Sequence, residues 1–450
     1  MKVLFVSLGC DKNLVDTEEM LGILGDKGYK YTDDETEADV IIINSCCFIG
    51  DAKEESINTI LEMAECKKNN VCKALIVTGC LAQRYKDEII KEIPEVDGIL
   101  GTANYDSIYE LVEECLHKNS LDKKNPSGDE KDLFELTRLP KLTKRVVTTG
   151  GYYAHLKISD GCNKNCTYCI IPKVRGKYRS FPMEDLIKQA EELAQNGTKE
   201  IILVAQETTL YGVDLYGEKS LHKLLKALCK ISGIEFIRIM YCYPEEIYDE
   251  LIETIKSESK ICHYLDIPIQ HANDEILRKM GRRTDKNRLI EVIKKLRTEI
   301  PDIALRTTLI SGFPGETKEA FEELLDFVDE MEFERLGVFA YSPEEGTVAA
   351  TMKEQIDEDI KNDRKDEIME LQQDIAFRKS EAMIGKEVTA IVDGKLPNEN
   401  AYAARTYMDA PDIDGCIFVN TDYELMSGEI VKVKVIGSFE YDLIGELVED

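Results

Sequence analysis

The chain has 450 residues, more than one ordinary hydrophobic core requires, and at roughly 150 residues per domain we expect about three domains. Hydrophobic residues make up 43% and charged residues 32%, which excludes a disordered chain. A net charge of −30, from 57 basic and 87 acidic side chains, argues against a partner bound through phosphates and suits a basic partner or simple solubility.

Residues 1–117 are predicted to form a parallel α/β domain, because three short apolar runs are each followed by a helical pattern. The strands are expected at Val3–Leu8, Val40–Ile43 and Ala74–Thr78, and the helices at Leu14–Leu24, Ala52–Ala64 and Tyr85–Ile93. A polar stretch at 118–144, containing Asn125-Pro126-Ser127-Gly128, is predicted to be a linker.

Residues 145–352 are predicted to form a second α/β series, a full or partial (β/α) barrel of about six units. Its strands are expected at Ala154–Ser159, Glu200–Ala205, Phe236–Met240, Tyr264–Pro268, Ala304–Ser311 and Arg335–Ala340. Residues 353–383 are charged and favour helix, which indicates a connecting helix.

From residue 384 to 450 the pattern changes to short β-rich runs separated by Gly, Asn and Asp. The runs are Val388–Val392, Cys416–Val419, Glu429–Ile436 and Asp442–Leu447. This pattern predicts a small antiparallel β-barrel. The fold class is therefore multidomain α/β with a β-barrel as its third domain.

The 14 cysteines need an explanation of their own. No signal peptide opens the sequence, and no apolar run approaches the roughly 20 residues that span a bilayer. We therefore expect a cytoplasmic protein without membrane contact. Stable disulfides are rare in the cytoplasm. In that compartment, numerous cysteines indicate metal or catalytic thiolates.

The strongest chemical signal is the segment Gly161-Cys162-Asn163-Lys164-Asn165-Cys166-Thr167-Tyr168-Cys169. Three thiolates at this spacing can hold one iron–sulfur cube and leave its fourth iron open. The alternatives are a zinc site or core cysteines that share this spacing by coincidence. Zinc would need a fourth Cys or His, and the only close histidine is His155.

A second set of three cysteines follows the predicted strands of the N-terminal domain. Cys10, Cys46 and Cys80 each end a strand run, and they are 36 and 34 residues apart, about one strand–helix unit. The carboxyl ends of parallel strands share one edge, so these thiols can converge there. Three independent buried cysteines are the alternative. Cys47 competes with Cys46, but alternation along a strand would aim only one of them at the site.

The cysteine loop after the first core strand resembles the radical S-adenosylmethionine signature, and its pairing with an N-terminal three-cysteine domain resembles the methylthiotransferases. The resemblance covers nearly the whole chain, with a TRAM-type barrel at 384–450. It implies that Cys162, Cys166 and Cys169 hold a [4Fe-4S] cluster whose open iron is chelated by the methionine part of S-adenosylmethionine, with Tyr168 against the adenine. Reductive cleavage would then yield a 5′-deoxyadenosyl radical.

By the same resemblance, Cys10, Cys46 and Cys80 would hold a second [4Fe-4S] cluster that carries or donates sulfur. One S-adenosylmethionine would methylate that sulfur and another would generate the radical. The net reaction would insert a methylthio group into a C–H bond. A ferredoxin or flavodoxin is a plausible reductant.

Three further segments resemble family loops. Gln206 and Glu207 follow a strand, and a carboxylate there suits the ammonium of S-adenosylmethionine, although a capped helix start is the alternative. Gly312 would permit a close backbone approach near the adenosyl group, or would simply serve a strand–helix turn. The segment 341–347 matches a family motif without independent chemistry.

The family divides between tRNA adenosine, modified at its 2-position, and the β-carbon of an aspartate in a small-subunit ribosomal protein, S-twelve. Three segments resemble the ribosomal-protein branch, whereas the tRNA branch usually has Gln-Met-Asn after the first cysteine. They are Ser7–Asp16, Leu265–His271 and Asp409–Gly415. His271 is either a substrate contact or a structural histidine.

Charge gives an independent indication of the substrate. Residues 381–450 carry five basic and 15 acidic side chains, a net charge of −10. A barrel that follows an RNA backbone should be basic, so this one favours a basic ribosomal protein over tRNA, unless its charge serves solubility alone. Two other function classes explain less. An iron–sulfur electron carrier does not need open irons, and an RNA-binding adaptor needs a basic barrel.

Overall fold

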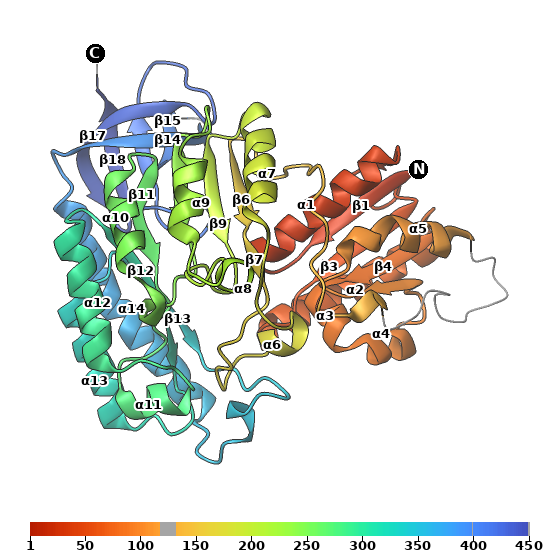
Figure 1. Ribbon diagram of the computed structural model, residues 1–450, viewed down its shortest axis with the longest axis horizontal. Coiled ribbons are helices and arrows are strands. Elements are labelled where there is room, and N and C mark those ends of the chain that lie inside the picture. Colours follow the sequence, from red (N-terminus) through yellow and green to blue (C-terminus); the bar gives the residue numbers. More distant parts are fainter. Residues whose placement is uncertain (118–131, 398, 449–450) are drawn as a thin grey trace.

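The computed structural model describes residues 1–117, 132–397 and 399–448. Most of the predicted linker, including Asn125-Pro126-Ser127-Gly128, lies outside the described residues. The N-terminal sheet, drawn in red and orange, and the barrel, drawn in blue, lie on different sides of the core (Figure 1). Across the described residues, none of the helices is apolar over a length that could cross a membrane.

The N-terminal domain is a five-stranded sheet in the order β2-β1-β3-β4-β5, and every pair of neighbouring strands is parallel. All six side chains of its central strand β3 are buried, as expected for a parallel strand covered on both faces. The strands are β1 (Lys2–Ser7), β2 (Lys30–Tyr31), β3 (Val40–Ser45), β4 (Ala74–Thr78) and β5 (Gly98–Leu100). The helices are α1 (Asp11–Asp26), α2 (Gly50–Asn69), α3 (Gly79–Arg84), α4 (Lys86–Glu92) and α5 (Ile108–His117).

The core is a six-stranded parallel sheet in the order β13-β12-β11-β10-β9-β6, which confirms the predicted partial barrel. Its strands are β6 (Tyr153–Lys157), β9 (Glu200–Val204), β10 (Phe236–Ile239), β11 (Ile261–Asp266), β12 (Ala304–Ser311) and β13 (Arg335–Ala340). A small two-stranded antiparallel sheet flanks the cysteine loop. It consists of β7 (Ser159–Asp160) and β8 (Arg179–Ser180). The helices are α6 (Ile171–Val174), α7 (Met183–Gln195), α8 (Val213–Tyr216), α9 (Leu221–Leu228), α10 (Asp249–Ser257), α11 (Asp274–Lys279), α12 (Lys286–Glu299) and α13 (Lys318–Met331).

The long helix α14 (Glu358–Glu381) connects the core to the barrel. It packs on β12, β13 and α13 and also contacts β17 of the barrel. The helix therefore fixes the barrel to the edge of the core sheet, in the segment where the sequence predicts a connecting helix.

The last domain is a closed barrel in the order β14-β15-β16-β18-β17. Its strands are β14 (Glu387–Lys395), β15 (Ala401–Thr406), β16 (Ile417–Asn420), β17 (Ile430–Phe439) and β18 (Asp442–Leu447). The predicted small barrel is confirmed, with one difference in strand direction. β16 and β18 run parallel, because closure brings these two strands side by side. β15 was not predicted from the sequence.

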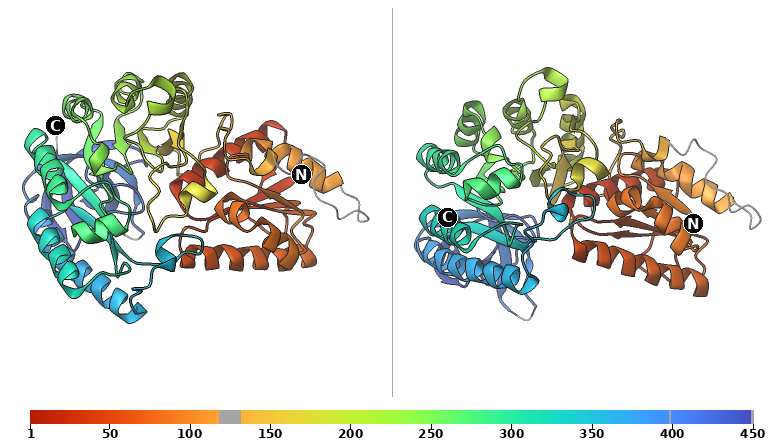
Figure 2. Two further views of the ribbon diagram at one scale, coloured as in Figure 1. Left: turned by 60° about the horizontal axis from the view of Figure 1, so that its bottom comes forward. Right: turned by 90° about the horizontal axis from the view of Figure 1, so that it is seen from below.

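The barrel shares a hydrophobic core with the sheet of the central domain. Tyr153, Ile202 and Tyr264 of the core strands pack in one cluster with Ala390 and Val433 of the barrel. Figure 2 shows the barrel and the core as adjoining bodies from two further directions. The barrel is therefore packed against the central domain and is more than a module connected through a linker.

Candidate active site

Cys162, Cys166 and Cys169 lie on one loop between β7 and α6. The Cys169 amide donates to the Cys166 carbonyl at 3.1 Å, and the Cys162 amide donates to the Gly176 carbonyl at 3.1 Å, which folds the loop back on itself. Burial raises the pKa of the Cys169 thiol, and the neighbouring Cys166 and Cys162 thiolates raise it further. The three sulfurs therefore lie within electrostatic reach of one another.

Hydrogen-bond donors surround these sulfurs. Cys162 and Cys169 each accept a hydrogen bond at 3.4 Å from the backbone amide two residues further on. The Cys166 sulfur lies 3.9 Å from the hydroxyl of Tyr243. Burial raises the pKa of Cys162 to about 11, so the donors compensate part of the cost of forming the thiolate that a cluster requires.

Cys10, Cys46 and Cys80 come from three strand ends and meet at one edge of the N-terminal sheet. Cys10 precedes α1, Cys46 follows β3, and Cys80 stands in the first turn of α3. Gly9 has a φ of +88°, and a Cβ there would lie 2.7 Å from the Cys46 sulfur, so only glycine lets Cys46 pack beside Cys10. Burial raises the pKa of Cys80, Arg175 opposes the rise, and the Cys47, Cys10 and Cys46 thiolates add to it.

Asn13 joins the three strand ends. Its Nδ2 donates to the Leu8 carbonyl at 3.0 Å and to the Ser45 carbonyl at 3.1 Å. Its Oδ1 lies 3.8 Å from the sulfur of Cys80. One side chain of α1 therefore contacts the segments that carry all three cysteines.

Cys47 has different neighbours from Cys46. Its carbonyl accepts a hydrogen bond from Arg84 at 3.3 Å, and its side chain is fully buried in the hydrophobic cluster that includes Ile170 and Val174. Burial raises the pKa of Cys47 to about 11. Cys46, which touches Gly9, is therefore the thiol nearer to Cys10.

Both cysteine sets offer only thiols, the donors that iron–sulfur clusters use. In the part of the chain that the structure describes, no three Cys, His, Asp or Glu side chains come close enough together to hold a single metal ion. A four-iron cube places each thiolate on a separate iron, so its ligands do not converge on one point. The donor chemistry of each set fits such a cluster.

A buried ionic network lies between the two cysteine sites. Arg175, 1% exposed, donates to Asp16 at 3.0 Å and to Asp160 at 3.2 Å, and also to the Oδ1 of Asn13. Lys157 forms a second ion pair with Asp16. Asp160 stands two residues before Cys162, and Asn13 contacts Cys80, so the network spans the gap between both sites. This network could not be predicted from the sequence, because its residues form no motif.

Glu207 carries an unsatisfied carboxylate oxygen close to the core cysteine loop. The side chain is fully buried, and its Oε1 accepts a hydrogen bond from the Thr209 amide at 2.9 Å. Its Oε2 has no partner among the described residues, and neither has the Oε1 of Gln206. Burial raises the pKa of Glu207 to about 7. An orphaned carboxylate oxygen beside thiolates fits a cationic ligand group, such as the ammonium of S-adenosylmethionine.

Tyr168 and Gly312 are brought together through Phe313. The rings of Tyr168 and Phe313 meet edge to face, with centroids 6.5 Å apart. Gly312 has a φ of +68°, and a Cβ there would lie 2.2 Å from the Cγ of Lys361 in α14. Glycine is therefore required at position 312 because α14 packs closely against it. A role of Gly312 beside the adenosyl group stays a prediction.

His271 is fully buried, and its Nδ1 accepts a hydrogen bond from the Asn273 amide at 2.9 Å. Its Nε2 lies 3.7 Å from Glu316 and has no hydrogen-bond partner among the described residues. A structural role and a substrate contact both stay predictions.

A cavity of about 360 Å³ lies where the three domains meet. Cys10 and Asp11 line it from the N-terminal domain, His155 and Tyr241 from the core, and residues 410–413 from the barrel. Tyr241 has a left-handed φ of +59°, and its hydroxyl donates to Asp11 at 3.2 Å. Strained backbone of this kind accumulates at functional sites.

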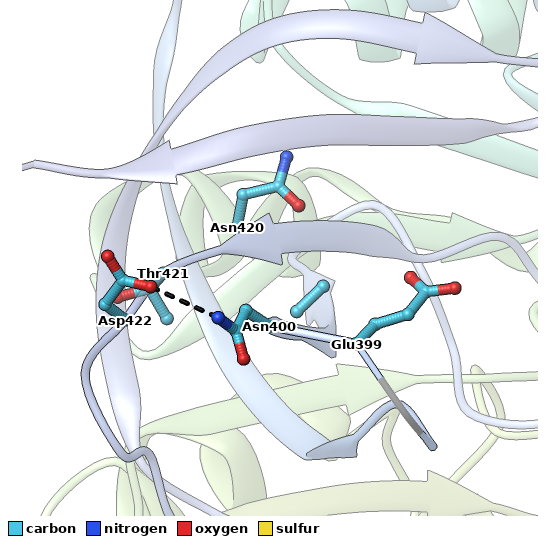
Figure 3. A pocket seen from close by; sticks show the side chains of 6 residues that line it. Glu399, Asn400, Asn420, Thr421 and Asp422 are labelled. Carbon is cyan, nitrogen blue, oxygen red and sulfur yellow. Dashed lines mark hydrogen bonds between the residues drawn. The ribbon is translucent and has the colours of Figure 1, made fainter.

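A second pocket, of about 440 Å³, lies on the barrel and is shown in Figure 3. Glu399, Asn400, Asn420 and Asp422 line it, and Asn400 donates to Asp422 at 3.3 Å. None of its lining residues is a cysteine, whereas Cys10 lines the three-domain cavity.

Three charged residues of the barrel segment form ion pairs with the core. Asp409 pairs with Arg335, and Asp414 lies 3.3 Å from Arg306. Arg405, one of the five basic barrel residues, is 3% exposed and lies 2.6 Å from Glu200. The other charged residues of this segment still carry a net charge of −9, so the charge-based preference for a basic substrate stays a prediction.

Known families match all three domains. Residues 156–328 match the radical SAM superfamily, residues 384–448 match the TRAM domain, and residues 2–101 match an uncharacterized protein family, UPF0004. Solved structures resemble the fold at low sequence identity. The cobalamin- and [4Fe-4S]-bound radical S-adenosylmethionine methyltransferase TsrM from Kitasatospora setae has a TM-score of 0.56 at 14% identity, over 77% of this chain and 76% of that one.

Relatives match over the full length. A protein of Lachnoclostridium phytofermentans named "Ribosomal protein uS12 methylthiotransferase RimO" is 60% identical over 445 residues, which cover 99% of each chain. A protein of the same name from Acetivibrio thermocellus is 51% identical over 450 residues, 100% of this chain and 99% of the other. With its radical SAM core and TRAM barrel in place, the chain is an enzyme that belongs to the radical S-adenosylmethionine methylthiotransferase family.

Proposed function

We propose that the protein adds a methylthio group to the β-carbon of one aspartate of ribosomal protein uS12. The observation that carries the proposal is the cavity that joins Cys10, the core sheet and the barrel loop 410–413, in a chain 60% identical to a protein named for that activity. A side chain entering this cavity reaches the N-terminal cysteine site while its neighbours contact the barrel.

We assign one [4Fe-4S] cluster to Cys162, Cys166 and Cys169, and a second one to Cys10, Cys46 and Cys80. When bound at the core site, S-adenosylmethionine supplies the hydrogen-abstracting species and the methyl group. Cys46, Cys80, Cys162 and Cys166 are buried and Cys169 is half-buried, whereas Cys10 is exposed and lines the cavity.

Two core segments are suited to orient S-adenosylmethionine. Glu207 offers its free Oε2 to the ammonium, and Gln206 offers a buried amide oxygen beside it. Tyr168, held against Phe313, offers a ring to the adenine, and the Gly312 backbone lies next to that ring pair. These groups bind and position the cofactor, and none of them needs to move a proton.

The cavity combines a neutral histidine with acidic side chains at its wall. Burial lowers the pKa of His155, so its imidazole is neutral at neutral pH. The exposed barrel residues Asp412 and Ile413 stand at the cavity wall, where a carboxylate would attract basic residues near the target aspartate. The reaction also needs an electron donor, for which a ferredoxin or flavodoxin is suited, and a cytoplasmic location near ribosomes.

An anaerobic assay that offers both family substrates tests the proposal. Reconstituted protein, S-adenosylmethionine and a chemical reductant are incubated with ribosomal protein uS12 and, separately, with tRNA, and adducts are read by mass spectrometry. We expect a methylthio adduct on an aspartate of the ribosomal protein, and none with a Cys162→Ala variant. An adduct on tRNA adenosine with none on the protein would overturn the choice of substrate.

A further inference from the structure

The segment 341–347 contacts both parts of the molecule that carry the cysteine sites. Its sequence motif alone indicates no chemical role. The segment leaves the end of β13 and continues to Ala349 before α14 begins. On one side it meets α3, whose first turn holds Cys80, and on the other it meets the loop that holds Cys166. We call residues 341–349 the bridging loop.

A buried ion pair joins the bridging loop to the N-terminal domain. The Glu344 carboxylate accepts a hydrogen bond from Arg84 at 3.0 Å, and the two side chains are only 4% and 9% exposed. Arg84 also donates to the carbonyl of Glu345 at 2.6 Å and to the carbonyl of Cys47 at 3.3 Å. Lys53 is a weaker second partner of Glu344, at 3.8 Å. Arg84 thus holds the bridging loop against the residue that follows Cys46.

Two hydrogen bonds join the bridging loop to the core cysteine loop. The Ala349 amide donates to the carbonyl of Thr167 at 2.9 Å, and Thr167 directly follows Cys166. The Lys173 ammonium, in α6, donates to the carbonyl of Gly346 at 2.6 Å. The loop therefore reaches from the backbone of Cys47 to the backbone of Thr167.

Internal hydrogen bonds make the bridging loop a stiff spacer. The Thr347 hydroxyl donates to the Glu344 carbonyl at 2.6 Å, and the Ser342 hydroxyl donates to the Glu344 carboxylate at 3.1 Å. The bridging loop thus fixes the position of the Glu344 carboxylate. The ion pair with Arg84 therefore holds the two domains in one defined arrangement.

We propose that Arg84 and Glu344 are positioning residues that set the placement of the N-terminal cysteine site relative to the core cysteine loop. The inference rests on the proposed function, because it concerns transfer between those two sites. A reaction that starts at one site and finishes at another depends on alignment, and a misplacement of about 1 Å can cost on the order of a hundredfold in rate. A buried ion pair is costly to desolvate, and fixing one arrangement is its best-attested use.

The test separates cofactor cleavage from product formation in the reconstituted full-length enzyme. Glu344→Gln removes the carboxylate from both Arg84 and Lys53, Arg84→Met removes the guanidinium, and Arg84→Lys keeps a cation that can donate to Glu344 and to the neighbouring carbonyls. Lys256→Gln, which breaks an exposed pair with Glu299, is the matched control. For each protein, iron content, 5′-deoxyadenosine and methylthio product are measured together.

We expect Glu344→Gln to keep its iron and its rate of S-adenosylmethionine cleavage, while deoxyadenosine formed per methylthio product rises on the order of ten- to a hundredfold. Arg84→Met should uncouple as strongly as Glu344→Gln, Arg84→Lys should keep most of the coupling, and Lys256→Gln should leave the ratio unchanged. An unchanged ratio in Glu344→Gln, or a ratio in Arg84→Lys as high as in Arg84→Met, overturns the proposal. If Glu344→Gln loses iron, the comparison of Arg84→Lys with Arg84→Met decides.

A second measurement does not need activity. Hydrogen exchange of the cluster-free protein should show faster exchange in the bridging loop and α3 of Glu344→Gln than in Lys256→Gln, and equal exchange in both would count against the proposal. The wild-type arm keeps the two proposals distinguishable. Wild-type enzyme that cleaves the cofactor without modifying uS12 refutes the substrate assignment, whereas a coupled wild type with an equally coupled Glu344→Gln refutes only the positioning role.

Discussion

The two cysteine sites are built on opposite principles. Cys162, Cys166 and Cys169 belong to one short loop, closed by hydrogen bonds within it and to its immediate surroundings. Cys10 and Cys80 are brought together only when β1, β3 and β4 pair in register. One site is therefore a local motif and the other a product of tertiary structure, so the second should be the more sensitive to changes elsewhere in the fold.

Removing each set of thiols should have the largest effect and separates the two sites. Alanine at Cys162, Cys166 and Cys169 should abolish cofactor cleavage and leave about four irons per chain on the N-terminal site. The reciprocal variant at the N-terminal cysteines should keep cleavage and lose the methylthio product. Iron analysis and deoxyadenosine assays read both. If iron falls to zero in the core variant, the N-terminal site does not assemble independently.

Arg175 connects the two sites, and its loss should damage the N-terminal one through the fold. Arg175→Met removes the guanidinium from Asp16 and Asp160. Because Lys157 still pairs with both carboxylates, the cost should stay below the about 3–5 kcal/mol of an uncompensated buried charge. Arg175→Lys keeps the charge but not the fork, so it should lose less. The unfolding midpoint and hydrogen exchange of α1 measure the difference. Equal stability of the two variants would show that the positive charge at position 175 does not contribute to the stability of the fold.

The buried Glu207 should make the stability of the protein depend on pH. Because burial raises the pKa of Glu207 to about 7, the folded protein keeps a proton there that the unfolded chain releases near 4.5. The free energy of unfolding should therefore fall as pH rises from 4.5 to 7, by about 3 kcal/mol from this group. Glu207→Gln removes that dependence. Denaturation of cluster-free protein across this range, with exposed Glu184→Gln as control, checks it, and parallel curves for all three proteins would contradict it.

Gly9 tests whether the N-terminal site depends on backbone space. An alanine at Gly9 combines a left-handed φ with a Cβ at 2.6 Å from the Cβ of Cys46, whereas at Gly28, with φ +87°, nothing lies within 4 Å. Gly28→Ala should cost about 1–2 kcal/mol from strain alone. Gly9→Ala should add about 1–3 kcal/mol of overpacking and reduce iron at the N-terminal site only. Equal iron content in the two variants would argue against the close packing of Cys46.

The sequence predicted the parts of the molecule that follow regular patterns. The apolar runs located the three central N-terminal strands, all six core strands and four of the five barrel strands. The edge strands β2 and β5 were missed, because two or three residues carry too little pattern to recognise. The core cysteine loop could be read directly, since its ligands are consecutive in the chain.

The polar face of α1 could not be predicted. Apolar spacing indicated the helix Leu14–Leu24, and such helices usually bury their apolar stripe and expose the rest. Here Asn13, Asp16 and Glu18 are buried as well, because the core supplies Arg175 and Arg145 as partners. Complementary charges from distant segments leave no periodic signal in either segment.

The contacts between barrel and core limit how substrate preference could be transferred by exchanging domains. Asp409, Asp414 and Arg405 of the barrel each match a charged residue on the core strands. A barrel transplanted from a relative with other residues there would leave Arg335 without its carboxylate partner, and Arg306 and Glu200 would keep only their core partners Asp266 and Arg238. A chimera would need these core residues exchanged together with the barrel, so the unit of recognition that can be moved is the barrel plus the face of the sheet on which it rests.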